Sequence, residues 1–146
     1  MWLAVDADGE AAHKLLKKLG GLPETVAFTS GKQGRCQYLL RVPNEYWSVF
    51  KTIKLDTKIK DKDGKPQLLE FRWNSCASVL PPSVHPETGE YKWVVHLDEG
   101  EIAETPIWVI ELMSQQRGRV PRLVHVSGAE RLLTGVLNQE APQQKC

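Results

Sequence analysis

Apolar residues over the first hundred positions occur in short runs, which are separated by turns rich in glycine, proline and charged residues. Short apolar runs bounded by such turns are typical of β-strands. The pattern predicts strands at residues 2–5, 25–29, 37–42, 53–59, 68–73, 77–80 and 91–96. The run 53–59 alternates apolar and polar residues, as an exposed strand does, and the Asp63-Gly64 pair behind it marks a solvated turn.

Helical spacing of apolar residues occurs near both ends of the chain. Apolar residues recur at intervals of three and four over 12–19, and Gly20-Gly21 follows them. We therefore expect a helix that begins near Asp8 or Gly9 and ends at the glycine pair. Further helices are expected at 44–50, 106–116 and 128–138. In the helix at 106–116, the side chains expected to point inward are Ile107, Ile110 and Met113.

Strands fill the middle of the chain and helices its ends, which favours an α+β fold. We expect a single mixed, mostly antiparallel β-sheet with flanking helices. A length of 146 residues suits one domain, expected over residues 1–138, and the polar end at 139–146 should form a flexible tail.

Composition and charge narrow the functional classes. The net charge is +1, so any basic surface for nucleic acid must be local. No apolar run approaches the roughly 20 residues of a membrane span, so no membrane partner is expected. Residues 1–6 lack the basic and long apolar regions of a signal peptide, and a cytoplasmic location is therefore expected.

Two acids at the end of the first predicted strand, Asp6 and Asp8, are the first candidates for chemistry. Side chains in a strand alternate between its faces, so these two share one face and could hold a divalent cation. Glu70 adds a third carboxylate from another predicted strand, and hard cations such as Mg²⁺ and Mn²⁺ prefer oxygen ligands. Alternatively, Asp8 caps the following helix, and Glu70 is a solvent-facing strand residue.

The loop between the second and third predicted strands holds two glycines and two cations, so its backbone could wrap an anion. Lys32 and Arg35 are the cations a nucleoside triphosphate would need. The Ser30 hydroxyl, the Gly31 N–H and the Gln37 amide are further hydrogen-bond donors. Alternatively, the loop is an ordinary solvated turn.

A second loop, at residues 81–86, contains three prolines in six positions. The prolines fix the backbone and hold Ser83 and His85 in set directions. Rigid loops that present polar groups usually do so for a ligand. A structural histidine that is hydrogen-bonded to its own loop is the alternative.

Taken in order, six short motifs resemble those of the N-terminal catalytic domain of bifunctional DNA primase/polymerases, in the archaeo-eukaryotic primase superfamily. The motifs are Val5-Asp6-Ala7-Asp8, Leu22-Pro23-Glu24-Thr25, Thr29-Ser30-Gly31, Leu69-Glu70-Phe71-Arg72, Pro81-Pro82-Ser83-Val84-His85-Pro86 and Tyr91-Lys92-Trp93. The resemblance covers the chain from Leu3 to about Trp93.

The resemblance implies a DNA primase/polymerase-type nucleotidyltransferase. Such an enzyme adds nucleotides from nucleoside triphosphates on a DNA template during DNA replication, and two Mg²⁺ or Mn²⁺ ions clamp the reacting groups. It implies that Asp6, Asp8 and Glu70 are the catalytic metal ligands. The nucleotide-binding residues implied are Ser30, Gly31, Lys32, Arg35, Gln37, Arg72 and His85.

The chain departs from the family pattern in two ways. Gln37 stands where the family usually has a histidine that contacts the nucleotide, and an amide cannot carry charge or shuttle a proton. The chain also starts almost on its first motif, where the family has a substantial preceding segment. We therefore expect either a cut longer protein or a shortened relative, whose uncovered surface favours a homodimer or a replication partner. The alternative functions are a non-catalytic nucleotide- or partner-binding relative and a metal-dependent phosphohydrolase or nuclease.

Overall fold

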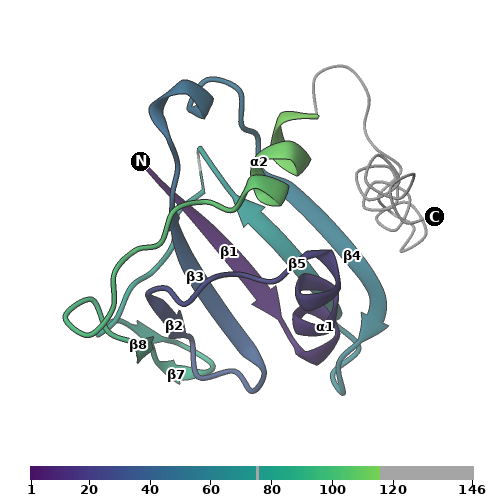
Figure 1. The fold of residues 1–146 in the computed structure, drawn as a ribbon. Helices are drawn as coiled ribbons and strands as arrows, with labels where there is room; N and C mark the ends of the chain where they lie inside the picture. Colours follow the sequence, from purple (N-terminus) through teal and green to yellow (C-terminus); the bar gives the residue numbers. More distant parts are fainter. Residues whose placement is uncertain (75, 116–146) are drawn as a thin grey trace, which may run out of the picture.

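The computed structural model describes residues 1–74 and 76–115. Its centre is a six-stranded antiparallel sheet with the strand order β4-β5-β1-β3-β2-β8 (Figure 1). The strands of this sheet are β1 (Trp2–Asp8), β2 (Ala27–Thr29), β3 (Arg35–Arg41), β4 (Ile53–Lys60), β5 (Pro66–Arg72) and β8 (Lys92–Val95). The other elements are helix α1 (Glu10–Leu19), the 3-10 turn η1 (Asn44–Tyr46), β6 (Val84–His85), β7 (Gly89–Glu90) and helix α2 (Ile107–Ser114).

One face of the sheet carries the main core. Leu3, Val5 and Ala7 of β1 are fully buried there, because alternate residues of a strand point to the same side. Helix α1 packs on this face against β1, β5 and β4, and its buried residues are Ala12, Leu15, Leu16 and Leu19. Buried residues of α2 join the same cluster. The predicted α+β fold with a mostly antiparallel sheet and flanking helices is therefore confirmed.

The opposite face of the sheet is apolar at one end and polar at the other. Ala4, Phe28 and Leu39 belong to a small second core there, which the half-buried Trp93 of β8 also contacts. Asp6 lies two residues beyond Ala4 on β1 and is also buried. This face therefore carries charged side chains around Asp6, next to the small apolar cluster.

The strand predicted at residues 77–80 is absent, and the segment is irregular in the structure. Val79 is half-exposed, and Pro81 restricts the backbone of the residue before it. The carbonyl of Ala77 instead accepts a hydrogen bond from Nη2 of Arg72 at 2.7 Å. The apolar residues of this segment therefore belong to a loop that contacts Arg72 of the polar face, and not to a strand.

The proline-rich segment and the helices also differ in detail from prediction. The proline-rich loop contains the short β6–β7 hairpin, a separate two-stranded sheet that the sequence pattern did not predict. The helix predicted at 44–50 is a 3-10 turn over Asn44–Tyr46. In α2 Met113 is buried as predicted, but Ile107 is 75% exposed, because this helix is apolar on almost every side and spacing does not define its inward face. The helix predicted at 128–138 and the tail at 139–146 lie outside the described residues.

Both described helices are short. Within residues 1–74 and 76–115, no helix combines the length and the apolar character needed to cross a bilayer.

Candidate active site

The three acids singled out in the sequence come from two neighbouring strands on the polar face of the sheet. In the antiparallel pairing of β1 with β5, Asp6 lies directly opposite Glu70. On the other side of β1, the partner of Asp6 is Gln37 of β3. Asp8 follows two residues later and pairs in register with Arg35. Partners across a ladder point to the same face, so the side chains of Asp6, Asp8, Arg35, Gln37 and Glu70 lie on one surface, here named the acid surface.

Asp6 is the buried centre of this surface, and its side chain is 4% exposed. The guanidinium of Arg35 forms a bidentate pair with its carboxylate, with Nε 3.2 Å from Oδ1 and Nη2 2.7 Å from Oδ2. The amide of Gln37 donates to Oδ2 at 3.2 Å, and Nη1 of Arg72 lies 3.6 Å from the same oxygen. The hydrogen bond to Asp6, outweighing burial, raises the pKa of Arg35, so this guanidinium stays charged.

Glu70 is more accessible than Asp6 and is paired more loosely. Nζ of Lys54 lies 3.2 Å from its Oε1, and Nε of Arg72 lies 4.0 Å from its Oε2. Arg72 therefore lies between the two acids, as expected from its position on the same strand face as Glu70. Lys54 carries no signal in the sequence, because only the register of β4 with β5 places it opposite Glu70.

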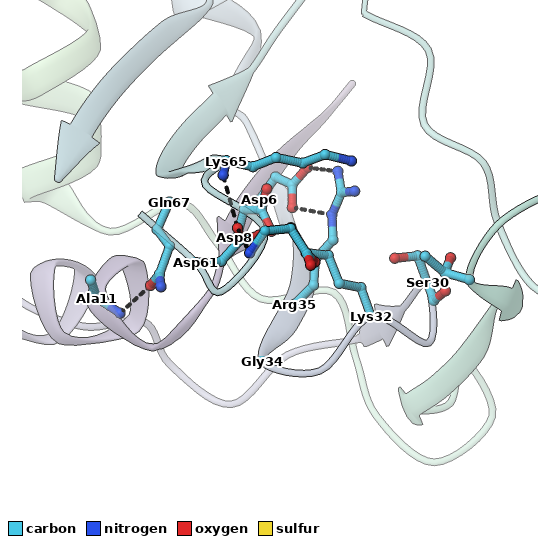
Figure 2. A network of polar contacts seen from close by, with 12 residues as sticks. Asp6, Asp8, Ala11, Ser30, Lys32, Gly34, Arg35, Asp61, Lys65 and Gln67 are labelled. Carbon is cyan, nitrogen blue, oxygen red and sulfur yellow. Dashed lines mark hydrogen bonds and ion pairs between the residues drawn. The ribbon is translucent and has the colours of Figure 1, made fainter. Parts of the chain in front are cut away.

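Asp8 is the last residue of β1 and does not cap the helix. The N-cap of α1 is Gly9, which makes no side-chain cap hydrogen bond to the helix. Oε1 of Gln67 on β5 accepts the N–H of Ala11 at 2.8 Å instead (Figure 2). Of the two roles that the sequence left open for Asp8, the cap is therefore wrong.

Asp8 is instead paired with the hairpin loop between β2 and β3. Nζ of Lys32 lies 3.0 Å from Oδ1 of Asp8 and 3.1 Å from Oδ2 of Asp61, which belongs to the β4–β5 turn (Figure 2). Burial lowers the pKa of Lys32, but the hydrogen bonds to the two acids outweigh it and raise the pKa. Asp61 carries no functional signal in the sequence, because nothing in its local sequence distinguishes it from a solvated turn residue.

The hairpin loop is held in a fixed path by its glycines. Gly31 has φ +81°, and a Cβ there would lie 2.5 Å from the carbonyl oxygen of Thr88. The carbonyl of Gly34 accepts the N–H of Gly9 at 3.1 Å, which ties the loop to the start of α1. Ser30 is buried, and its hydroxyl oxygen has no hydrogen-bond partner among the described residues. The loop thus places the ammonium of Lys32 beside Asp8, while the hydroxyl of Ser30 is buried without a partner among the described residues.

His85 makes its contacts with its own loop. Its Nδ1 accepts the N–H groups of Glu87 at 3.1 Å and Thr88 at 3.2 Å, and its ring packs near that of Tyr91. These contacts favour the structural alternative for this histidine. A nucleotide-binding role for His85 stays a prediction.

A cleft of about 820 Å³ opens beside Asp8. Its lining includes Asp8, Lys32, Asp61, His13, Gln67 and Thr88. It lies between the start of α1, the hairpin loop and the β4–β5 turn. Asp6 and Glu70 are outside its lining, so the cleft adjoins the acid surface at Asp8 rather than enclosing it.

The donor set suits a divalent metal, but the side chains are not arranged around one. In the described part of the chain, no three His, Cys, Asp or Glu side chains are grouped closely enough to hold a metal ion. Instead, each of the three acids is paired with a cation. The side-chain amide oxygen of Gln37, Oε1, is buried without a hydrogen-bond partner among the described residues. Carboxylate and amide oxygens are ligands of the kind that Mg²⁺ and Mn²⁺ prefer, and the paired cations would have to move before the acids could bind such an ion.

Comparison with known proteins gives one match. A family model described as "Bifunctional DNA primase/polymerase, N-terminal" matches residues 1–108. No curated protein sequence and no solved structure gives a significant match.

Proposed function

The chain belongs to the family of bifunctional DNA primase/polymerase N-terminal domains, and on this premise we propose that it catalyses metal-dependent, template-directed addition of nucleotides to DNA. The substrates would be nucleoside triphosphates and a DNA template. The observation that carries the proposal is the register of β1 with β5, which sets Asp6 opposite Glu70 on the polar face. Carboxylates in this arrangement are those that a nucleotidyltransferase needs.

Asp6, Asp8 and Glu70 are the residues that would hold Mg²⁺ or Mn²⁺. When bound, the metal would neutralise the triphosphate and activate the attacking 3′-hydroxyl. Asp6 is already fixed from two sides of β1 and is withdrawn from water, which limits the side-chain entropy lost on binding.

The cations around the acids would serve a second purpose. Arg35 and Arg72 both lie within 4 Å of the Asp6 carboxylate, and Lys54 pairs with Glu70. With a divalent ion held by the acids, these cations would be repelled from the carboxylates and attracted to the phosphate groups of the nucleotide. We expect the guanidinium groups to turn from the carboxylates to the triphosphate, where their planar forks can bind phosphate oxygens.

Gln37 would act through Asp6 rather than on the nucleotide. Its Nε2 donates to Oδ2 of Asp6, so the amide orients the carboxylate and cannot exchange a proton with it. In this respect the chain departs from the histidine expected at this position. We therefore expect no rate dependence on ionisation at position 37.

Primer extension on a DNA template tests the proposal. Wild-type protein with Mn²⁺ or Mg²⁺ should extend a primer, and Asp6→Asn and Asp8→Asn should each reduce the rate at least about a hundredfold. Asp56→Asn is a matched control, because Asp56 is an acid on the neighbouring β4 that forms its ion pair with Lys58 and none with Asp6, Asp8, Glu70 or their described cation partners. Extension that is equal in the Asp6→Asn and Asp56→Asn proteins contradicts the proposal.

A non-catalytic nucleotide-binding domain is the second candidate function. Gln37 and the complete pairing of the three acids with cations favour it. Metal-dependent binding of a nucleoside triphosphate without incorporation, measured under conditions of primer extension, would support this candidate over the first. Release of inorganic phosphate or cleavage of DNA would instead indicate a phosphohydrolase or nuclease.

A further inference from the structure

Asp61, in the turn between β4 and β5, has no role in the proposed reaction so far. We infer that Asp61 is a positioning residue for Lys32: it holds that ammonium in the cleft, where the phosphates of an incoming nucleoside triphosphate bind. The inference rests on the proposed function. In this role Asp61 binds a lysine side chain and does not bind the metal ion.

The turn itself fixes the Asp61 side chain. Its Oδ1 accepts the N–H groups of Asp63 at 2.9 Å and Lys65 at 2.8 Å, and its own N–H donates to the carbonyl of Lys65 at 2.8 Å. Its other oxygen, Oδ2, lies 3.1 Å from Nζ of Lys32 (Figure 2). One oxygen therefore shapes the turn, and the other is left for the ammonium.

Lys32 is shared between two acids that come from different elements. Asp8 lies at the end of β1 and Asp61 in the β4–β5 turn, and their side chains are 24% and 15% exposed. Water therefore screens these ion pairs less than pairs on an open surface. The lysine crosses from the hairpin loop to the facing turn and bounds the cleft on this side.

A metal ion on Asp8 would change this balance. The ion attracts the carboxylate of Asp8 and repels the ammonium of Lys32, so Asp8 no longer holds the lysine. Asp61 then remains as the partner that keeps the ammonium in the cleft. A lysine side chain free to move through solvent loses conformational entropy when it binds phosphate, whereas a lysine already held in place loses less.

The Asp61→Asn variant separates the two roles of this side chain. Asparagine keeps an oxygen that accepts the N–H groups of the turn, but it has no negative charge for Lys32. We expect the Kd for dATP with Mn²⁺ and the KM in primer extension to rise about fivefold, with kcat within about twofold of wild type. Asp63→Asn is the matched control, because it removes an equal charge from the same turn at a residue that forms no described ion pair with Lys32.

A second variant, Lys32→Gln, shows whether the effect passes through the lysine. In this background Asp61→Asn should leave the Kd for dATP unchanged, since the group that Asp61 holds is gone. Additive effects of the two substitutions contradict the inference, as does an Asp61→Asn protein that matches Asp63→Asn. Tighter binding by Asp61→Asn also overturns it, because Asp61 would then compete with phosphate for Lys32. A wild-type protein that binds no dATP refutes the proposed function itself, and the inference with it.

Discussion

The buried carboxylate of Asp6 gives the sharpest test of the site in its metal-free form. Many catalytic acids lie among like charges, and replacing them stabilises the protein. Asp6 lies among cations instead, with Arg35 at 2.7 Å, Arg72 at 3.6 Å and the amide of Gln37 at 3.2 Å from Oδ2. Asp6→Asn would leave two guanidinium groups side by side without their shared partner. We therefore expect this substitution to destabilise the fold.

The contacts of Asp6 set the size of the effect. Removing one member of a buried ion pair costs about 3–5 kcal/mol when the remaining charge is cut off from water. Arg35 and Arg72 are 27% and 21% exposed, and asparagine still offers one oxygen as an acceptor, so we expect a smaller loss of about 2 kcal/mol. With an m-value of about 2 kcal/mol per M, the urea midpoint should fall by about 1 M.

Urea unfolding in EDTA, followed by tryptophan fluorescence, measures this loss. Glu70→Gln is the matched control, because Glu70 faces Asp6 across the ladder but pairs with Lys54, which is 62% exposed. Its loss should stay below about 1 kcal/mol. An Asp6→Asn protein as stable as wild type, or more stable, would refute the described pairing of Asp6.

Three further predictions concern other residues near the site. Gly31→Ala should weaken dATP binding and lower stability by about 1–3 kcal/mol in urea unfolding, because Gly31 has φ +81° and a Cβ would meet the carbonyl oxygen of Thr88; wild-type behaviour would contradict this loop path. Iodoacetamide at pH 8 should modify the exposed Cys76 well before Cys36, whose pKa is raised by burial, and peptide mass spectrometry would show the reverse order if this were wrong. The pKa of Asp61 is lowered by a backbone hydrogen bond in its turn and by Lys32, so its stabilising effect is present above about pH 4 and fades as the pH falls through the lowered pKa. The difference between the urea midpoints of wild type and Asp61→Asn should therefore be constant from about pH 6 to about pH 4 and shrink below about pH 4.

The sequence predicted much of the acid surface because one rule governs it. The period of two in β1 puts Asp6 and Asp8 on one face, and this holds in the structure. The sequence could not show that Asp6 lies opposite Glu70, since the register of β1 with β5 depends on how the two strands pack. It also could not show which cation each acid is paired with, because those cations come from β3, β4, β5 and the hairpin loop.

The wrong strand prediction at residues 77–80 and the overlooked role of Asp61 also have local causes. Apolar residues at 77–80 resemble a strand, but Pro81 restricts the residue before it and the carbonyl of Ala77 bonds to Arg72 instead of to a neighbouring strand. The role of Asp61 depends on a contact with Lys32 across a cleft, and such contacts leave no pattern along the chain. Periodicity therefore predicted the faces of elements, while pairing between distant segments had to come from the structure.

The central claim is that Asp6, Asp8 and Glu70 act together on one metal centre when a nucleotide is bound. Titration of Mn²⁺ into the protein with dATP, followed by electron paramagnetic resonance, measures this directly. The account predicts that wild type binds Mn²⁺ in the ternary complex and that Glu70→Gln weakens this binding at least about tenfold, as does Asp6→Asn. Mn²⁺ binding by Glu70→Gln that equals wild type would contradict it, because Glu70 would then share a sheet face with Asp6 but not a metal.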